Sequence, residues 1–107
     1  MNRLQNKVAI VTGANSGIGL RTAQLFAEEG AILVLCARRK EKLDEVAEAL
    51  RAQGSQVLSI AADVSREEDC VRVVEEAVKA FGRVDVLVNN AQASASGVTL
   101  ADHTTDQ

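Results

Sequence analysis

The sequence predicts an α/β fold built on a doubly wound parallel sheet, and three observations support this fold class. Four short apolar runs alternate with three segments of helical periodicity along the 107 residues. Each connection is long enough for a crossover between parallel strands, and right-handed crossovers would place helices on both faces of the sheet. Hydrophobic residues make up 47% and charged residues 25% of the chain, which is typical of one globular domain.

The first strand and the first helix meet at a glycine-rich turn. The run Lys7–Thr12 is apolar, rich in β-branched residues and stops at Gly13, which is typical of a strand buried on both faces. Residues 17–30 then predict a helix that ends at Gly30. Four residues at helical spacing would form its apolar face: Ile18, Thr22, Leu25 and Phe26.

The second strand and helix follow the same pattern. The run Ile32–Cys36 predicts another buried strand, and the charged run Arg38–Lys42 then opens a helix. Gly54 would close this helix at its C-cap. The apolar face of the helix would comprise Leu43, Val46, Ala47 and Leu50.

A third strand and a third helix precede the last strand. The run Val57–Ala61 predicts the third strand, and Ser65 with Glu68 forms a capping-box pattern that predicts a helix start. This helix would end at Gly82. Its apolar face would comprise Cys70, Val73, Val74, Ala77 and Phe81.

The last predicted strand is the buried run Val84–Val88. Residues 89–107 are rich in Ala, Ser, Thr and Asp without periodicity, so they predict a loop, with at most a helix start near Leu100. A sheet of four strands leaves an edge of the last strand without a covering partner. We therefore expect residues 1–107 to be the N-terminal part of a single, larger domain.

Charge and composition exclude several classes of function. The chain has 12 basic and 15 acidic residues, so it lacks the basic surface that nucleic acid binding requires. Cys36, Cys70 and His103 are too few for a metal site or a disulfide framework, which favours a reducing, cytoplasmic setting. The longest apolar run, Ala31–Ala37, is far shorter than a membrane span, and the N-terminus lacks the apolar region of a signal peptide.

The chemistry of the chain concentrates in the segment Thr12–Gly19, which joins the first strand to the first helix. A helix start presents unpaired N–H groups, and glycines there allow a phosphate to approach the backbone. The G-x-x-x-G-x-G spacing of Gly13, Gly17 and Gly19 lacks the Lys-Ser/Thr of a triphosphate-binding loop, which disfavours ATP or GTP hydrolysis. The segment predicts binding of a nucleotide pyrophosphate, and the alternative is a tight turn without a ligand.

Three motifs at successive strand ends resemble those of the short-chain dehydrogenase/reductase family. They are Thr12-Gly13-x-x-x-Gly17-x-Gly19, Asp63-Val64 and Asn89-Asn90-Ala91, and the resemblance covers residues 6 to about 100. It implies a Rossmann-like dinucleotide-binding domain, because ligands of this architecture bind at the carboxyl ends of parallel strands. One departure is Gln92, where the family usually has a glycine.

The resemblance also implies which residues contact the cofactor. The glycine turn would carry the pyrophosphate and the adjoining ribose, Asp63-Val64 would border the adenine, and Asn90-Ala91 would lie beside the ribose on the nicotinamide side. The alternatives are that Asp63 only serves the nearby helix start and that Asn89-Asn90 is an ordinary turn. The expected cofactor-binding residues are Gly13, Asn15, Ser16, Gly17, Ile18, Gly19, Arg38, Asp63, Val64, Asn90 and Ala91.

The end of the second strand predicts NADP rather than NAD. Sites specific for NAD commonly place an acidic side chain there, which accepts a hydrogen bond from the ribose 2′-hydroxyl and repels a 2′-phosphate. This chain has Cys36-Ala37-Arg38-Arg39 instead, and guanidinium groups match phosphate in charge and geometry. The alternative is that both arginines only begin a solvated helix.

The resemblance implies a catalytic Ser-Tyr-Lys group farther along the chain than residue 107. The 107 residues contain no tyrosine, and neither Ser94 nor Ser96 has a histidine base nearby in sequence to activate it. We therefore assign no catalytic residue and expect this chain to be inactive on its own.

Two functions from different classes are compatible with these residues. The first is the NADP(H)-binding part of an oxidoreductase that transfers a hydride between nicotinamide and a small carbonyl or alcohol substrate, with the full-length protein forming a homo-oligomer. The second is a stand-alone nucleotide-binding or sensor module without catalysis. A methyltransferase on a similar sheet ranks last, because Ala37-Arg38 supplies no acid for a ribose diol.

Overall fold

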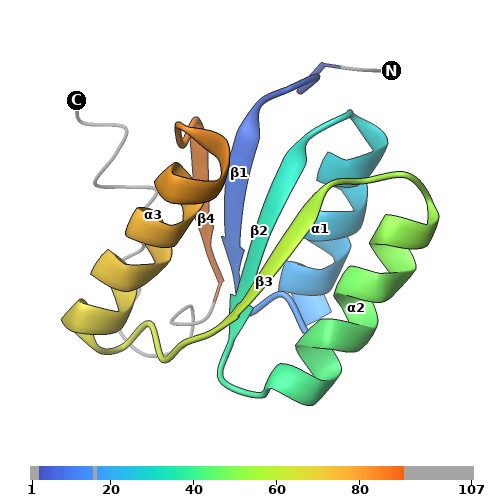
Figure 1. The fold of residues 1–107 in the computed structure, drawn as a ribbon. Helices are drawn as coiled ribbons and strands as arrows, with labels where there is room; N and C mark the ends of the chain where they lie inside the picture. The colour runs from blue at the N-terminus through green and yellow to red at the C-terminus, as the bar shows by residue number, and fades with distance from the viewer. Residues whose placement is uncertain (1–2, 16, 91–107) are drawn as a thin grey trace.

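The computed structural model of the protein describes residues 3–15 and 17–90, in which strands and helices alternate (Figure 1). The elements are β1 (Val8–Thr12), α1 (Gly17–Glu28), β2 (Ile32–Ala37), α2 (Lys40–Ala52), β3 (Val57–Ala61), α3 (Glu67–Phe81) and β4 (Val86–Asn89). Every predicted strand and helix is present, and their ends differ from the predicted ones by a few residues at most.

The sheet is entirely parallel, with the strand order β3-β2-β1-β4. The register pairs Thr12 with Cys36 on one side and with Asn89 on the other, so the carboxyl ends of β1, β2 and β4 lie at one edge. The chain runs outward from β1 to β3 and then crosses back to β4, so the winding direction changes beside β1. In doubly wound sheets this switch point is where ligands bind.

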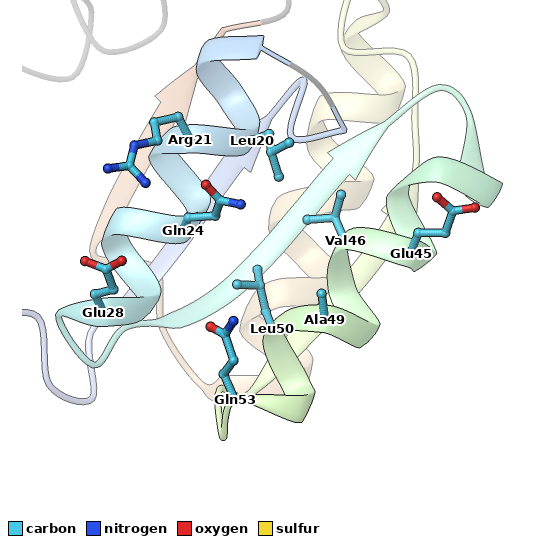
Figure 2. A pocket seen from close by; sticks show the side chains of 9 residues that line it. All are labelled: Leu20, Arg21, Gln24, Glu28, Glu45, Val46, Ala49, Leu50 and Gln53. Atoms are coloured by element: carbon cyan, nitrogen blue, oxygen red, sulfur yellow. The ribbon is translucent and has the colours of Figure 1, made fainter.

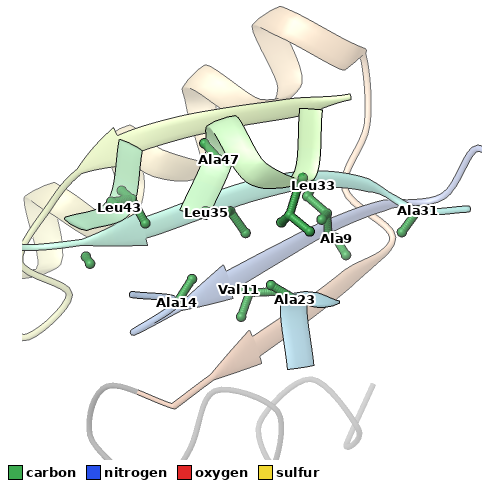
Figure 3. Close-up of a cluster of buried hydrophobic side chains, with 11 residues drawn as sticks. Ala9, Val11, Ala14, Ala23, Ala31, Leu33, Leu35, Leu43 and Ala47 are labelled. Atoms are coloured by element: carbon green, nitrogen blue, oxygen red, sulfur yellow. The ribbon is translucent and has the colours of Figure 1, made fainter. Parts of the chain in front are cut away.

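Helices cover both faces of the sheet, with α1 and α2 on one face and α3 on the other (Figure 1). The core beneath the helix pair includes Val11 of β1, Ala23 of α1 and Leu43 of α2 (Figure 3). The core beneath α3 includes Ile10 of β1 and Val73 of α3. Because alternate residues of β1 enter different cores, this strand is buried on both faces, and the predicted doubly wound α/β fold is confirmed.

The buried face of α1 differs from the predicted one. Gly19 and Ala23 are the buried residues of this helix, whereas Ile18 is 72% exposed and Leu25 is 43% exposed. The predicted apolar face was therefore wrong at Ile18 and Leu25, whereas Phe26 is half-buried and packs against the core as predicted. The cause is the close packing of Gly19 on the preceding turn, which turns its neighbour Ile18 toward solvent.

The ends of α2 place two charged residues outside the helix. The helix begins at Lys40 with Arg39 as its N-cap, so Arg38 precedes the helix instead of opening it. At the other end the C-cap is Gln53, one residue earlier than the predicted Gly54, which follows it with a φ angle of 100°. The position of Arg38 before the helix leaves its side chain beside the carboxyl end of β2.

The start of α3 contradicts the predicted capping box. The N-cap is Arg66, which makes no side-chain cap hydrogen bond, so Ser65 and Glu68 do not form the reciprocal pair. The Ser65 hydroxyl instead donates to Asp63 Oδ1 at 2.6 Å, because this acceptor lies only two residues away. Val74, predicted on the apolar face of α3, is 41% exposed.

The strand β4 is half-buried along its length and not fully buried as predicted. Within the described residues it pairs only with β1, so its other edge has no strand partner there. In this same part of the chain, no helix has both the length and the apolar character that crossing a membrane requires.

Candidate functional site

A cleft with a volume of about 860 Å³ lies at the carboxyl ends of the strands. Its walls come from the segments that follow β1, β2, β3 and β4, as expected for the ligand site of a doubly wound sheet. The lining residues are Gly13, Asn15, Ile18, Gly19, Cys36, Ala37, Arg38, Arg39, Ala62, Asp63, Val64, Ser65 and Asn90.

Three glycines shape the turn between β1 and α1, each in a different way. Gly13 and Gly17 have φ angles of 62° and 60°, a conformation that favours glycine. Gly19 lies so close to the turn that a Cβ atom would collide with the carbonyl group of Gly13. A Cβ atom at Gly17, by contrast, would have no neighbour within 4 Å. Gly17 therefore leaves open space at the N-terminus of α1, where helix N–H groups are unpaired.

The buried side chain of Thr12 connects the glycine turn to the end of β4. Thr12 is 2% exposed, and its hydroxyl donates to Asn89 Oδ1 at 2.8 Å and accepts from the backbone N–H of Asn90 at 2.9 Å. The Nδ2 atom of Asn90 is also buried, and it has no hydrogen-bond partner among the described residues. Since buried donors normally have partners, this amide is a candidate donor to a ligand in the cleft.

Two cations lie at the cleft where β2 ends. Arg38 and Arg39 are exposed, and neither forms an ion pair within the part of the chain that the structure describes. The neighbouring Cys36 is fully buried, and burial raises the pKa of its thiol to about 12. Cys36 is therefore a protonated core residue at neutral pH and not a reactive thiolate.

The Asp63 side chain is held at the cleft by Ser65. The Ser65 hydroxyl and backbone N–H donate to Asp63 Oδ1 at 2.6 Å and 3.0 Å. These two bonds, together with the positive charges of Arg38 and Arg66, hold the pKa of Asp63 below its ordinary value. The backbone N–H of Asp63 donates to Asp69 Oδ2 at 2.7 Å, and this bond links the loop between β3 and α3 to α3 itself. The cleft therefore contains a fixed carboxylate as well as two cations.

The structure brings the predicted site residues together wherever it describes them. All of them line the cleft except Gly17, which is the first residue of α1 and precedes the lining residue Ile18. Ser16, Ala91, Gln92, Ser94, Ser96 and His103 lie outside the described residues. Sequence reasoning missed Ser65 as a cleft residue. The available signal was its position two residues after an aspartate, which is the spacing of an Asx turn.

A second cavity of about 450 Å³ lies between α1 and α2 (Figure 2). Its lining mixes apolar side chains, such as Leu20 and Val46, with polar ones, such as Gln24 and Gln53. None of the predicted site residues lines this cavity. In the described ranges, no cluster of His, Cys, Asp and Glu side chains could hold a metal ion. The cleft at the strand ends is therefore the better candidate site.

Comparison with known proteins identifies the family of the chain. A family description of short chain dehydrogenases matches residues 7–107. The chain belongs to the short-chain dehydrogenase family. The family predicted from the glycine turn, Asp63-Val64 and Asn89-Asn90-Ala91 is thereby confirmed.

Several relatives in this family are similar to the chain. 11-beta-hydroxysteroid dehydrogenase 1A of Arabidopsis thaliana is 52% identical over 89 residues, which are 82% of this chain and 26% of the plant protein. L-sorbose reductase from Gluconobacter frateurii, solved with NADPH and L-sorbose, is 46% identical with a TM-score of 0.81. That match covers 85% of this chain and 35% of the reductase.

A short-chain dehydrogenase/reductase from Burkholderia phymatum, solved in complex with NAD, is a further structural neighbour. It is 36% identical with a TM-score of 0.77, and the match covers 81% of this chain and 31% of that protein. The chain thus spans between about a quarter and about a third of the length of each of these relatives. Both forms of the nicotinamide cofactor occur among the neighbours, one in each solved complex.

Proposed function

We propose that residues 1–107 form the NADP(H)-binding, N-terminal part of a single dinucleotide-binding domain. The whole protein would be an oxidoreductase that transfers a hydride between nicotinamide and a small carbonyl or alcohol substrate. The observation that carries this proposal is one cleft that joins a glycine turn at a helix N-terminus to two arginines without ion-pair partners in the described residues.

The glycine turn fits the pyrophosphate of a dinucleotide. The N-terminus of α1 offers unpaired N–H donors and a partial positive charge. The open space at Gly17 lets an anion approach this backbone, and a side chain there would fill that space. Ile18 also lines the cleft. This apolar residue is 72% exposed, so it is available to pack against the cofactor.

The carboxyl end of β2 fits a ribose that carries a 2′-phosphate. Arg38 precedes α2, lines the cleft and has no carboxylate within ion-pair distance in the described part of the chain. Ala37 stands where an NAD-specific site commonly has an acid. A 2′-phosphate would therefore meet the positive charge of Arg38, and the end of β2 itself carries no acidic side chain, which supports a preference for NADP.

The other two strand ends fit the remaining parts of the cofactor. Asp63 and Val64 line the cleft after β3, where they would border the adenine. Asn90 would lie beside the nicotinamide-side ribose, whose hydroxyl groups are acceptors for the unpartnered Nδ2 donor. Ala91 is part of the same proposed contact but lies outside the described residues.

The chain's own residues would bind and orient the cofactor. Bound nicotinamide supplies the hydride chemistry. Helix N–H groups would hold the pyrophosphate, and Thr12 would fix Asn90 at the cleft through their 2.9 Å hydrogen bond. We assign no proton donor among these residues, since the tyrosine that the family resemblance implies does not occur in them.

The free cysteines and the net charge bear on the environment and the partners of the whole protein. Cys36 and Cys70 are both free thiols, which supports a reducing, cytoplasmic setting. The net charge of −3 supports a small-molecule substrate over nucleic acid. A homo-oligomer remains our expectation for the full-length protein.

The test is the effect of Arg38→Ala on the binding of NADP⁺ and NAD⁺ to the full-length protein, measured by calorimetry. A charge-assisted phosphate contact contributes about 1.5–3 kcal/mol, so the variant should lose roughly ten- to a hundredfold in affinity for NADP⁺ and little for NAD⁺. Arg21→Ala is the matched control, because Arg21 is exposed on α1 and does not line the cleft. Equal affinity of the unaltered protein for both cofactors would reject the NADP preference.

A further inference from the structure

Arg38 and Asp63 follow neighbouring strands and line the same cleft. The register pairs Ala37 of β2 with Ala61 of β3, and Ala62 N–H donates to the Ala37 carbonyl at 2.9 Å. Adjacent strands lie about 4.8 Å apart, so the residues just after these two strands are close neighbours. Arg38 and Asp63 nevertheless form no ion pair, so the guanidinium stays available while a carboxylate lies near it.

The carboxylate of Asp63 is fixed in place. Ser65 donates twice to its Oδ1 atom, at 2.6 Å from the hydroxyl and at 3.0 Å from the backbone N–H. The positive charge of Arg66 also acts on this carboxylate, but the Arg66 guanidinium forms an ion pair with Glu68 at 3.2 Å. Movement of this carboxylate away from Ser65 would break both hydrogen bonds.

We propose that Asp63 is a specificity-determining residue that limits the preference of the cleft for NADP over NAD. Its carboxylate offsets part of the positive field of Arg38 at the place where the 2′-phosphate of NADP would bind. This inference rests on the proposed function, and it concerns the balance of charge in the cleft and not the adenine contact assigned above to the same residue.

The effect of the Asp63 charge can be distinguished from the effect of its adenine contact, because the two cofactors differ in one group. NADP and NAD carry the same adenine and the same pyrophosphate, so a change in the adenine contact alters both affinities equally. The 2′-phosphate is present in NADP alone and carries about −1.5 to −2 charges at neutral pH, by analogy with other phosphate monoesters. Repulsion by Asp63 therefore appears in the ratio of the two dissociation constants, Kd(NAD⁺)/Kd(NADP⁺).

The test uses Asp63→Asn in the full-length protein, with both dissociation constants measured by calorimetry. The asparagine Oδ1 can still accept both bonds from Ser65, so the turn is retained while the charge is removed. We expect the ratio Kd(NAD⁺)/Kd(NADP⁺) to rise about three- to tenfold, as for one partly exposed charge near a phosphate. The increase should shrink as salt is raised from low to about 0.5 M, because salt screens exposed charges.

Two further variants separate charge from shape. Asp63→Glu keeps the charge and changes the adenine contact, so its ratio should stay within about twofold of the unaltered protein. Glu75→Gln removes one charge from an exposed position on α3 that does not line the cleft, and it should leave the ratio unchanged. An unchanged or lower ratio for Asp63→Asn would overturn the inference alone. Failure of the unaltered protein to bind either cofactor would overturn the proposed function, and the inference with it.

Discussion

A side chain at Gly19 would collide with the carbonyl group of Gly13, so these two residues set how closely α1 approaches the end of β1. The same contact buries Gly19 and places the helix N-terminus beside the glycine turn, and the exposed Ile18 lines the cleft next to it. The motif glycines consequently have different functions. Gly19 is required for packing, whereas Gly17 is required for the open space above the helix N-terminus.

Gly19→Ala should destabilise the fold by about 1–3 kcal/mol or more, because overpacking of a closely packed position forces the backbone to shift. Gly17→Ala is the matched control, since its Cβ meets nothing within 4 Å and carries only the cost of the positive φ angle, about 1 kcal/mol. Denaturant unfolding of both variants provides the measurement. Equal loss of stability in the two variants would contradict the close contact between Gly19 and Gly13.

Gly17→Val should abolish nucleotide affinity while the protein remains folded. The branched side chain would fill the space through which we expect the pyrophosphate to reach the N–H groups of α1. Calorimetry with NADP⁺ measures the affinity, and circular dichroism checks that the variant is folded. Unchanged affinity in the folded variant would remove the basis for placing the pyrophosphate at this turn.

Thr12→Val should destabilise the protein by about 1–3 kcal/mol although it is nearly isosteric. The substitution removes the hydroxyl that bonds Asn89 Oδ1 and the Asn90 N–H, and it leaves those half-buried groups without this partner. Thr12→Ser keeps the hydroxyl and should lose less stability. The comparison is made by denaturant unfolding, and a valine variant as stable as the unaltered protein would contradict the role of the hydroxyl.

The sequence was sufficient to predict the order and type of every element, because each apolar run is short and each segment of helical periodicity ends near a glycine. It was not sufficient for the buried face of α1. Ile18 has the spacing of a core residue, yet the contact between Gly19 and Gly13 turns it outward. That contact joins two elements, so a pattern within one helix does not contain it.

Most residues of the candidate site could be predicted from the sequence, but two of their side-chain interactions could not. The motifs at the strand ends identified most of the cleft, since parallel strands bring their carboxyl ends together. The choice of partner for Ser65 was not predictable from the capping-box spacing, because Asp63 competes for the same hydroxyl. The buried, unpartnered amide of Asn90 also depends on the packing of β4 against β1, which sequence spacing does not define.

Acidic pH should lower the stability of the fold, partly through Asp85. This residue lies at the end of the sheet opposite the cleft. Its Oδ2 atom accepts from the backbone N–H of Val8 at 2.8 Å, and Arg83 donates to the same carboxylate. The hydrogen bonds from Arg83, and then that from Val8, hold the pKa of Asp85 below its ordinary value. The contribution to stability is therefore complete above the unfolded-state pKa of about 3.9, and it is lost as the pH falls through the lower pKa of the folded state.

Asp85→Asn tests this pH dependence, since the variant has no carboxylate to titrate. The unaltered protein should be the more stable of the two at pH 7, and the difference between their melting temperatures should shrink below about pH 4. Thermal unfolding followed by circular dichroism from pH 7 to pH 2.5 measures both curves. A constant difference across that range would show that Asp85 does not contribute through its charge.

Residues 1–107 should show no dehydrogenase activity by themselves, even with saturating NADP⁺ or NADPH and a panel of alcohols and ketones. Binding and orienting the cofactor is one part of hydride transfer, and the substrate oxygen also needs a proton donor tuned near the working pH. The chain contains no tyrosine, so the donor used in its family is missing from these residues. The measurement is the cofactor absorbance near 340 nm, with the full-length protein as the positive control. Turnover by the 107 residues alone would show that a side chain within them supplies the proton, and Ser94, Ser96 and His103 would then be the first residues to substitute.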